Sequence, residues 1–221
     1  RYISVTGVQT CALPISRTKD IMVVDNFLTP SEIRYIKGLA LENKWSNEKN
    51  NADNTDGTWY RWRDLTEMYN GNERDYRAMY VKDIQNRIMK FCEEQIPQYK
   101  DLKIDYVGVA AQTAGFCYHA DAEYPELESE RDLGWPDSST FEYKRPFSRY
   151  IPNYCPYRVY TAVCYLNDDL TGGETVLPDF QLDVKPKAGR MVTFPSSSEY
   201  IHGVRPTTQG VRYAFTAWYK K

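Results

Sequence analysis

The stretch RVYTAVCYLNDDLTGGETVLPDFQLDVKPKAGRMVTF at residues 158–194 is the part of the chain from which we predict its fold. Its short runs of β-branched and aromatic residues are separated by turn residues such as Thr171–Gly173. Further runs of this kind occur at 103–112 and 211–219. Several short strands at this spacing are typical of a β-sandwich or jelly roll. We therefore predict a mainly β fold with a jelly-roll core at about 103–219.

The segment before this core is predicted to be helical. Thr29, Pro30 and Glu32 form a capping-box pattern, in which threonine and glutamate side chains satisfy amides that the first helical turn leaves unpaired. Apolar residues recur at helical spacing after Glu32 and again over 73–94. We expect these two helices to lie in an N-terminal part at about 17–100 and to pack against the sheet.

The first 16 residues differ from the rest of the chain. Residues 5–15 resemble the conceptual translation of a sequencing adapter, and segments of this kind are left out of fold reasoning. We expect residues 1–16 to be non-native and residues 17–221 to form a single domain. The alternative is a short apolar signal sequence, although no basic segment precedes a long apolar one.

One long segment lacks any periodicity. Residues 122–157 are rich in Tyr, Pro, Glu and Ser, and long connections inside compact domains are commonly lids, binding loops or disordered segments. Because this segment begins directly after a candidate metal motif, we predict a lid over that site. A plain insertion is the alternative.

The composition excludes several function classes. With 221 residues, 42% hydrophobic content and a formal charge of -2, the chain is long enough for one core and lacks the positive charge that attracts nucleic acid. No apolar run approaches the roughly 20 residues of a membrane helix, so we expect no membrane association. The five cysteines form no CxxC pair, which favours free thiols and, by default, a cytoplasmic location.

Both histidines of the chain lie in patterns that suit a metal ion. His119 and Asp121 alternate at a predicted strand end, so that both side chains point to the same side. His202 is distant in sequence and would be brought in by the fold. Two histidines and one carboxylate leave the opposite face of a metal open, as in non-haem Fe(II) oxygenases. The alternative is a surface histidine that happens to lie beside an acid.

Arg212 lies ten residues after His202. The alternate residues of its run are small or apolar: Ala214, Thr216 and Trp218. An arginine on such an inward face is unfavourable unless an anion meets it. A bound dicarboxylate would supply that anion, because a guanidinium can hold a carboxylate through two parallel hydrogen bonds. The alternative is an ion pair with one of the 30 acidic residues.

Several motifs follow one another in a familiar order: HxD, R-x-x-T-x-x-x-Y-L-N-D, GGET, P-x-x-G-R, and H-G-V with an arginine ten residues on. The matching residues are His119 and Asp121; Arg158, Thr161, Tyr165, Leu166, Asn167 and Asp168; Gly172 to Thr175; Pro186, Gly189, Arg190 and Phe194; and His202 with Arg212. With this pattern the chain resembles the prolyl hydroxylase branch of the 2-oxoglutarate- and Fe(II)-dependent oxygenases, over roughly residues 103–219. The ending with H-G-V and Arg212 is more similar to leprecan prolyl 3-hydroxylase-like members and to small microbial or phage-type members than to collagen prolyl 4-hydroxylases, which usually carry lysine in place of Arg212.

The resemblance implies a double-stranded β-helix, or cupin-like, core and a set of cofactors. His119, Asp121 and His202 would hold Fe(II) and are the implied catalytic residues. Arg212 would bind the distal carboxylate of 2-oxoglutarate, and Tyr165 would hydrogen-bond the same co-substrate. O2 would be the second co-substrate, and ascorbate is a further candidate cofactor.

Three more residues receive a role from the resemblance. Trp218 would pack near the metal. The family often carries a tyrosine on the strand before HxD that helps to bind 2-oxoglutarate, whereas this chain has Gln112 there. Gln112 or Thr161 would then take the place of that tyrosine.

The implied reaction is hydroxylation of an unactivated C–H bond, on a prolyl residue of a peptide or protein, with release of succinate and CO2. Two alternatives stay open: an oxygenase for a free amino acid or small metabolite, and a jelly-roll module that binds peptides or sugars without catalysis. A nucleic-acid demethylase is disfavoured because Trp218 stands where that group carries a second arginine. A zinc hydrolase is disfavoured because HExxH is absent.

Overall fold

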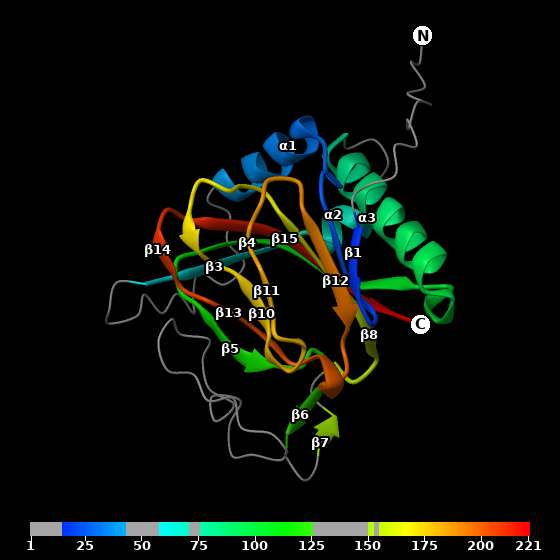
Figure 1. The fold of residues 1–221 in the computed structure, drawn as a ribbon. Coiled ribbons are helices and arrows are strands. Elements are labelled where there is room, and N and C mark those ends of the chain that lie inside the picture. Colours follow the sequence, from blue (N-terminus) through cyan, green and yellow to red (C-terminus); the bar gives the residue numbers. More distant parts are fainter. Residues whose placement is uncertain (1–14, 43–57, 71–75, 126–149, 153–154) are drawn as a thin grey trace.

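Seven strands form the larger of two facing sheets in the computed structural model (Figure 1), which describes residues 15–42, 58–70, 76–125, 150–152 and 155–221. Each strand is antiparallel to its neighbours. In spatial order the strands are β1 (Ile15–Thr18), β2 (Ile21–Val24), β12 (Met191–Pro195), β8 (Arg158–Tyr165), β15 (Arg212–Lys220), β4 (Lys103–Gln112) and β3 (Tyr60–Asp64).

Four short strands form the smaller sheet. In spatial order they are β11 (Leu182–Val184), β10 (Thr175–Leu177), β13 (His202–Val204) and β5 (Phe116–His119). Two further ladders join β14 (Thr207–Gln209) to β9 (Thr171–Gly172), and β6 (Glu123–Pro125) to β7 (Tyr150–Pro152). Apolar side chains of both sheets meet in one cluster, among them Val163, Phe194, Leu177 and Val184. Two antiparallel sheets around a shared core confirm the predicted mainly β, jelly-roll fold.

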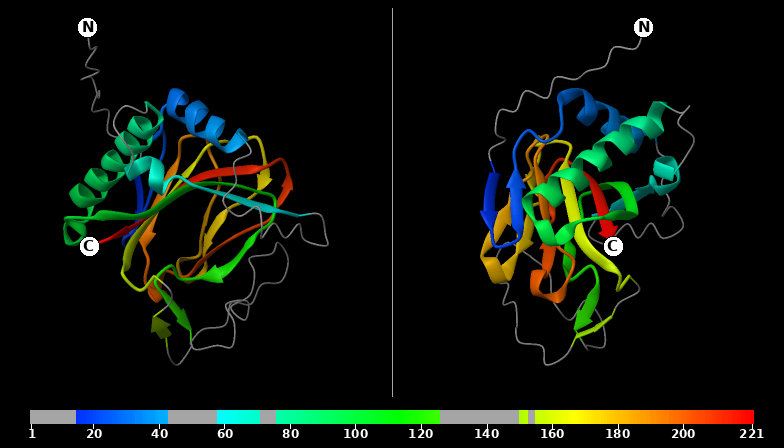
Figure 2. Two further views of the ribbon diagram at one scale, coloured as in Figure 1. Left: turned by 180° about the vertical axis from the view of Figure 1, so that it is seen from behind. Right: turned by 90° about the vertical axis from the view of Figure 1, so that its right-hand side faces the viewer.

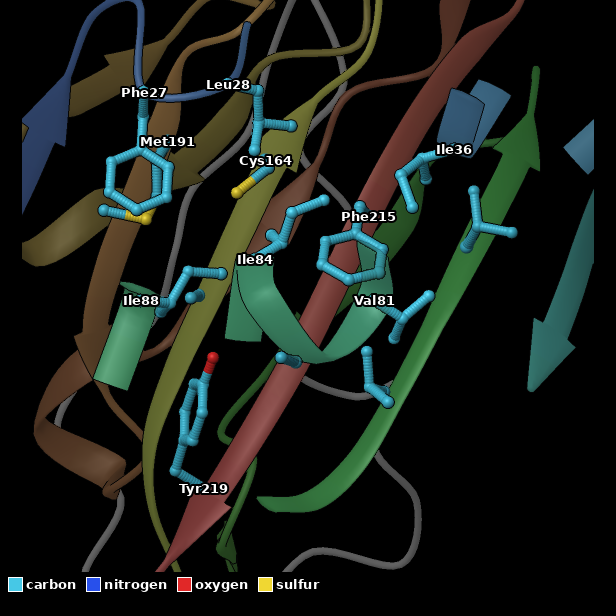
Figure 3. Close-up of a cluster of buried hydrophobic side chains, with 14 of the residues drawn as sticks. Phe27, Leu28, Ile36, Val81, Ile84, Ile88, Cys164, Met191, Phe215 and Tyr219 are labelled. Carbon is cyan, nitrogen blue, oxygen red and sulfur yellow. The ribbon is translucent and has the colours of Figure 1, made fainter. Parts of the chain in front are cut away.

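Helices cover the outer face of the larger sheet (Figure 2). They are α1 (Pro30–Leu41), α2 (Thr66–Asn70) and α3 (Tyr76–Gln95), and short 3-10 turns lie at Pro97–Tyr99, Pro178–Phe180 and Ser198–Tyr200. Figure 3 shows the main core between them and the sheet, where Val81, Ile84 and Ile88 of α3 lie beside Phe215 and Tyr219 of β15. The helices therefore bury one face of the sheet and leave its other face to the smaller sheet.

Helix α1 begins at the predicted capping box. The Thr29 N–H donates to Glu32 Oε2 at 2.8 Å, and the Glu32 N–H donates to Thr29 Oγ1 at 3.3 Å. Arg87 of α3 donates to both carboxylate oxygens of Glu32, at 2.8 and 3.0 Å. Glu32 therefore both caps α1 and links it to α3.

Two predictions about segments fall largely outside the described residues. Residues 1–14 of the expected adapter segment and residues 126–149 and 153–154 of the expected lid are not described. Ile15 and Ser16, which we assigned to the adapter segment, pair with Val24 and Val23 in the β1–β2 hairpin. The domain boundaries and the lid stay predictions.

Asp25 ties the end of β2 to the turn before β12, and this contact should be sensitive to acid. Arg190 Nε and Lys187 Nζ donate to the Asp25 carboxylate at 2.6 and 2.8 Å. Their hydrogen bonds lower the pKa of Asp25 from 3.8 to about 2. A lowered pKa stabilises the folded state above about pH 4, and this contribution is lost as the pH falls toward 2.

We expect Asp25→Asn to lower the free energy of unfolding at pH 7 by about 1–2 kcal/mol. The difference from the wild type should shrink between pH 4 and pH 2, because the wild-type carboxylate becomes protonated there. Urea unfolding of both proteins at a series of pH values measures this difference in the free energy of unfolding. A difference that stays constant down to pH 2 would contradict this account.

Candidate functional site

The three candidate metal ligands meet between the two sheets. His119 ends β5, His202 begins β13, and the two residues are direct cross-strand partners with ring centroids 4.3 Å apart. Each histidine Nε2 lies 3.7 Å from a carboxylate oxygen of Asp121. The three ligand atoms all lie within 4.8 Å of one another. The fold thus brings together the residues that the sequence predicted to share a metal.

Backbone carbonyls orient both imidazole rings. His119 Nδ1 lies 2.9 Å from the Cys117 carbonyl oxygen, and His202 Nδ1 lies 3.1 Å from the Tyr200 carbonyl oxygen. A carbonyl only accepts hydrogen bonds, so each Nδ1 carries the proton and donates it. Each Nε2 therefore keeps its lone pair and faces Asp121, which is the outer-shell arrangement usual for metal-bound histidines.

The protonation states also suit a divalent cation. Burial, with a smaller effect from the neighbouring His119, lowers the pKa of His202 to about 4, so its ring is neutral at pH 7. Burial raises the pKa of the Asp121 carboxyl, but the charges of His202 and His119 and a hydrogen bond from Thr161 together hold it below its usual value. A neutral imidazole and an ionised carboxylate are metal-binding forms. The donor set fits Fe(II).

Thr161 contacts the carboxylate of Asp121. Its hydroxyl donates to Asp121 Oδ2 at 2.6 Å and lies 2.9 Å from Ser196 Oγ. We predicted Thr161 as an alternative contact of the co-substrate, and its hydroxyl is instead bonded to a candidate ligand. Its role toward 2-oxoglutarate stays a prediction.

Arg212 is buried, and its hydrogen bonds to the described residues all go to neutral groups. Its Nε donates to the Gly173 carbonyl at 3.1 Å, and its two Nη atoms donate to Gln112 Oε1 at 3.3 Å and to Thr175 Oγ1 at 3.4 Å. Among the described residues no carboxylate forms an ion pair with this guanidinium. The alternative of a structural salt bridge therefore finds no support in the described part of the chain.

The other predicted residues lie around the same pocket. The Tyr165 hydroxyl donates to Thr175 Oγ1 at 2.7 Å, and its ring lies 5.2 Å from the Arg212 guanidinium carbon. The amide nitrogen of Gln112 donates to the Ala114 carbonyl at 2.8 Å. Trp218 lines the pocket. All eight predicted site residues thus lie at or beside one pocket, and their individual roles stay predictions.

Strand β3 supplies two pocket residues that the sequence did not reveal. Tyr60 and Trp62 line the pocket together with Arg212 and the ligand cluster, which consists of His119, Asp121 and His202. The Trp62 indole lies across Gly108 of β4, where an added Cβ would be only 2.2 Å from the ring. Glycine is therefore required at this position by the close approach of the indole. The alternation of aromatic residues at 60 and 62 was the available signal, but the polar sequence before it obscured the short strand.

One part of the chain matches the sequence profile of a known protein family. The sequence profile of the 2OG-Fe(II) oxygenase superfamily matches residues 140–220, which include His202 and Arg212. This part of the chain is therefore similar in sequence to the 2OG-Fe(II) oxygenase superfamily. His119 and Asp121 precede the matched segment, and the fold joins them to it. The predicted resemblance, the oxygenase character and the cofactors Fe(II), 2-oxoglutarate and O2 are confirmed at the level of this family, while ascorbate stays a prediction.

Several curated relatives of this chain are prolyl 3-hydroxylases. Prolyl 3-hydroxylase 2 of Rattus norvegicus and that of Homo sapiens are each 40% identical to it over 68 residues, or 28% of this chain. Prolyl 3-hydroxylase 1 of Homo sapiens is 37% identical over 68 residues. The aligned part spans only about a tenth of the length of these relatives.

Solved structures share the fold of the oxygenase domain. A viral collagen prolyl hydroxylase from Paramecium Bursaria Chlorella virus-1, in complex with 2OG, has a TM-score of 0.57 at 17% identity over 91% of this chain and 96% of that one. A prolyl hydroxylase from Trichoplax adhaerens, in complex with a hypoxia inducible factor peptide fragment, has a TM-score of 0.57 at 19% identity over 92% and 84%. At these identities the likeness establishes the fold.

Among the described helices, none is long and apolar enough to span a membrane.

Proposed function

We propose that this oxygenase domain hydroxylates an unactivated C–H bond of a prolyl residue in a peptide or protein. In this reaction the substrate R–H, 2-oxoglutarate and O2 become R–OH, succinate and CO2, so that one oxygen atom of O2 enters each of the two oxidised products. One observation carries the proposal: a buried arginine with neutral contacts shares a pocket with a cluster of two histidines and a carboxylate.

The ligand cluster would hold Fe(II), which supplies the activation of O2 when it is bound. His119, Asp121 and His202 provide three protein ligands, and three ligands leave further positions for a chelating co-substrate and O2. Thr161 keeps the Asp121 carboxylate in place through its 2.6 Å hydrogen bond. The backbone carbonyls that hold both imidazoles limit their rotation.

Arg212 would bind the distal carboxylate of 2-oxoglutarate. Its Nη contacts at 3.3 and 3.4 Å are longer than a typical N–H···O bond of about 2.9 Å. Its donors are therefore not saturated by the protein. A carboxylate would provide shorter, charge-assisted bonds and compensate a buried cation.

Aromatic side chains near the carboxylate ligand support a prolyl substrate. Trp62 and Trp218 line the pocket with ring centroids 5.6 Å apart, and the Trp62 indole N–H donates to the Tyr106 hydroxyl at 2.9 Å. Trp218 is the cross-strand partner of Thr161, whose hydroxyl binds Asp121. Flat aromatic faces offer large apolar contact area to a saturated ring such as pyrrolidine. The prolyl 3-hydroxylase relatives point to the same substrate class.

Mass spectrometry with a matched substrate panel tests the proposal. The iron-loaded protein is incubated with 2-oxoglutarate and O2, together with proline-rich peptides, the same peptides with alanine for proline, or free amino acids. We expect succinate and a product heavier by one oxygen atom with the proline peptides alone. A product from a free amino acid would favour the small-molecule alternative. Peptide binding without any succinate would favour a module that does not catalyse.

A further inference from the structure

A surface hollow lies between α1 and the start of α3, on the outside of the molecule (Figure 2). Its volume is about 440 Å³, and its lining includes Arg34, Tyr35, Gly38, Glu42 and Tyr80. The rings of Tyr35 and Tyr80 stack beside it, with centroids 4.7 Å apart. A Cβ added at Gly38 would meet no atom within 4 Å. The outer side of α1 is therefore open at Gly38, with room for a group from another molecule.

Exposed apolar side chains gather around this hollow. Of the four large hydrophobic side chains that are exposed among the described residues, three lie on α1 or at the start of α3. Leu41 is 59% exposed, Met79 50% and Tyr80 43%. Single exposed apolar residues are common, but a group of them at one place is typical of a protein–protein contact. The patch formed by α1 and the start of α3 is thus a candidate interface.

The charges on α1 are arranged so that this face complements a second copy of itself. Arg34 lies four residues before Gly38, and Glu42 lies four residues after it. Residues four apart lie on the same side of a helix. If two copies of α1 pack antiparallel about a twofold axis at Gly38, Arg34 of each copy lies opposite Glu42 of the other. A twofold interface consists of such reciprocal pairs.

The apolar residues follow the same symmetry. Tyr35 lies three residues before Gly38 and Leu41 three residues after it, so each tyrosine ring would lie opposite the exposed leucine of the other copy. The distance between packed helices depends on the side chains at the contact point, and glycine allows the closest approach. Gly38 is therefore a suitable crossing point.

Glu42 can take part in two ion pairs. Its Oε2 accepts hydrogen bonds from Arg63 Nη1 and Nη2, both at 3.2 Å, and its side chain remains 36% exposed. An ionised carboxylate has two oxygens and about four acceptor positions. A second guanidinium, that of Arg34 from the other copy, can therefore join the pair without displacing Arg63.

We infer that the chain forms a twofold dimer through α1, in which the two helices are antiparallel and cross at Gly38. The start of α3 lies beside this contact and adds Met79 and Tyr80. The inference goes beyond the proposed function and does not depend on it, because the candidate metal ligands lie between the two sheets and the contact lies on the outer helices.

Sedimentation velocity over a series of protein concentrations tests the dimer. The wild type should shift from monomer to dimer as the concentration rises. Gly38→Lys should raise the Kd of the dimer by about a hundredfold or more, because two lysines would meet at the twofold axis. Lysine favours a helix more than glycine does and has space at this position, so the variant should fold. Gln98→Lys is the matched control, since it adds the same charge at an exposed residue beyond the far end of α3.

Two charge reversals test the antiparallel arrangement. Arg34→Glu alone and Glu42→Lys alone would each place like charges at both pairs, so each variant should be a monomer. In an equal mixture, one copy of each variant gives two pairs of opposite charge, and the dimer should return. Because Glu42 also binds Arg63, thermal unfolding checks that Glu42→Lys is folded.

The inference is overturned if the wild type stays monomeric at every concentration, and a different partner would then cover the patch. It is also overturned if Gly38→Lys dimerises as the wild type does. If Gly38→Lys is monomeric but the mixture of folded Arg34→Glu and Glu42→Lys does not associate, the antiparallel pairing is wrong. Succinate formation is not needed for any of these measurements, so failure of the dimer and failure of the proposed function are distinguishable.

Discussion

Replacing Asp121 with alanine should abolish the formation of succinate from 2-oxoglutarate. Asp121 supplies the only carboxylate of the ligand cluster found among the described residues, and both histidine Nε2 atoms face it at 3.7 Å. Loss of an outer-shell partner typically costs 10–100-fold in metal affinity or activity, so loss of a ligand itself should exceed about a hundredfold. Succinate yield and Fe(II) affinity, measured side by side, should fall together.

A nearby acid provides the control for this variant. Glu123 lies two residues further on, and its carboxylate accepts a hydrogen bond from the Ser198 N–H at 2.8 Å, away from the ligand cluster. Glu123→Ala should therefore keep the wild-type Fe(II) affinity. Wild-type succinate yield in Asp121→Ala would reject the metal site.

Thr161 should show a graded effect in the same assay. Thr161→Val keeps the shape of the side chain and removes the hydroxyl that holds Asp121 Oδ2. We expect its Fe(II) affinity to fall about 10–100-fold. Thr161→Ser restores the hydroxyl and should restore the affinity. If Thr161→Val and Thr161→Ser behave alike, the hydrogen bond does not position the ligand.

The long elements of the fold could be predicted because their patterns are repeated many times. β4, β8 and β15 have eight to ten residues each, and α3 has 20. The capping box at Thr29 fixed the start of α1 for a local reason, since all its hydrogen bonds lie within four residues. In contrast, β13 and β14 have three residues each, too few for an alternation to be recognised. These short strands form only because a neighbouring strand supplies hydrogen bonds.

The ligand cluster was predictable from residue type, whereas the contacts around it were not. The chain has two histidines, so their spacing from Asp121 and Arg212 was informative on its own. Tyr60 precedes His119 by many residues, and its closeness to Arg212 follows only from the register of β3 on β4. The sequence also could not show that Thr161 binds Asp121, because this contact joins β8 to the end of β5. Contacts between strands of this kind can be predicted only when the order of the strands in the sheet is known.

Replacing Arg212 with methionine should remove 2-oxoglutarate binding and leave the ligand-free protein at least as stable as the wild type. A buried cation is costly unless it is paired, and the described contacts of Arg212 are neutral: Gly173, Gln112 and Thr175. Methionine has a similar length, no charge and enough flexibility to fill the space. The variant should therefore lose the group that binds the distal carboxylate of 2-oxoglutarate, without losing an ion pair within the protein.

Thermal unfolding with and without 2-oxoglutarate, in the presence of Fe(II) and without O2, measures both effects. A ligand at about a hundred times its Kd stabilises the wild type by about 2.7 kcal/mol, and this gain should vanish in Arg212→Met. Arg205→Met is the control, because Arg205 pairs with Asp183 at 2.8 Å near the surface and should keep the ligand response. Breaking a buried ion pair usually costs about 3–5 kcal/mol. A loss of that size in ligand-free Arg212→Met would mean that Arg212 pairs with an acid of the chain, and the case for a bound dicarboxylate would fail.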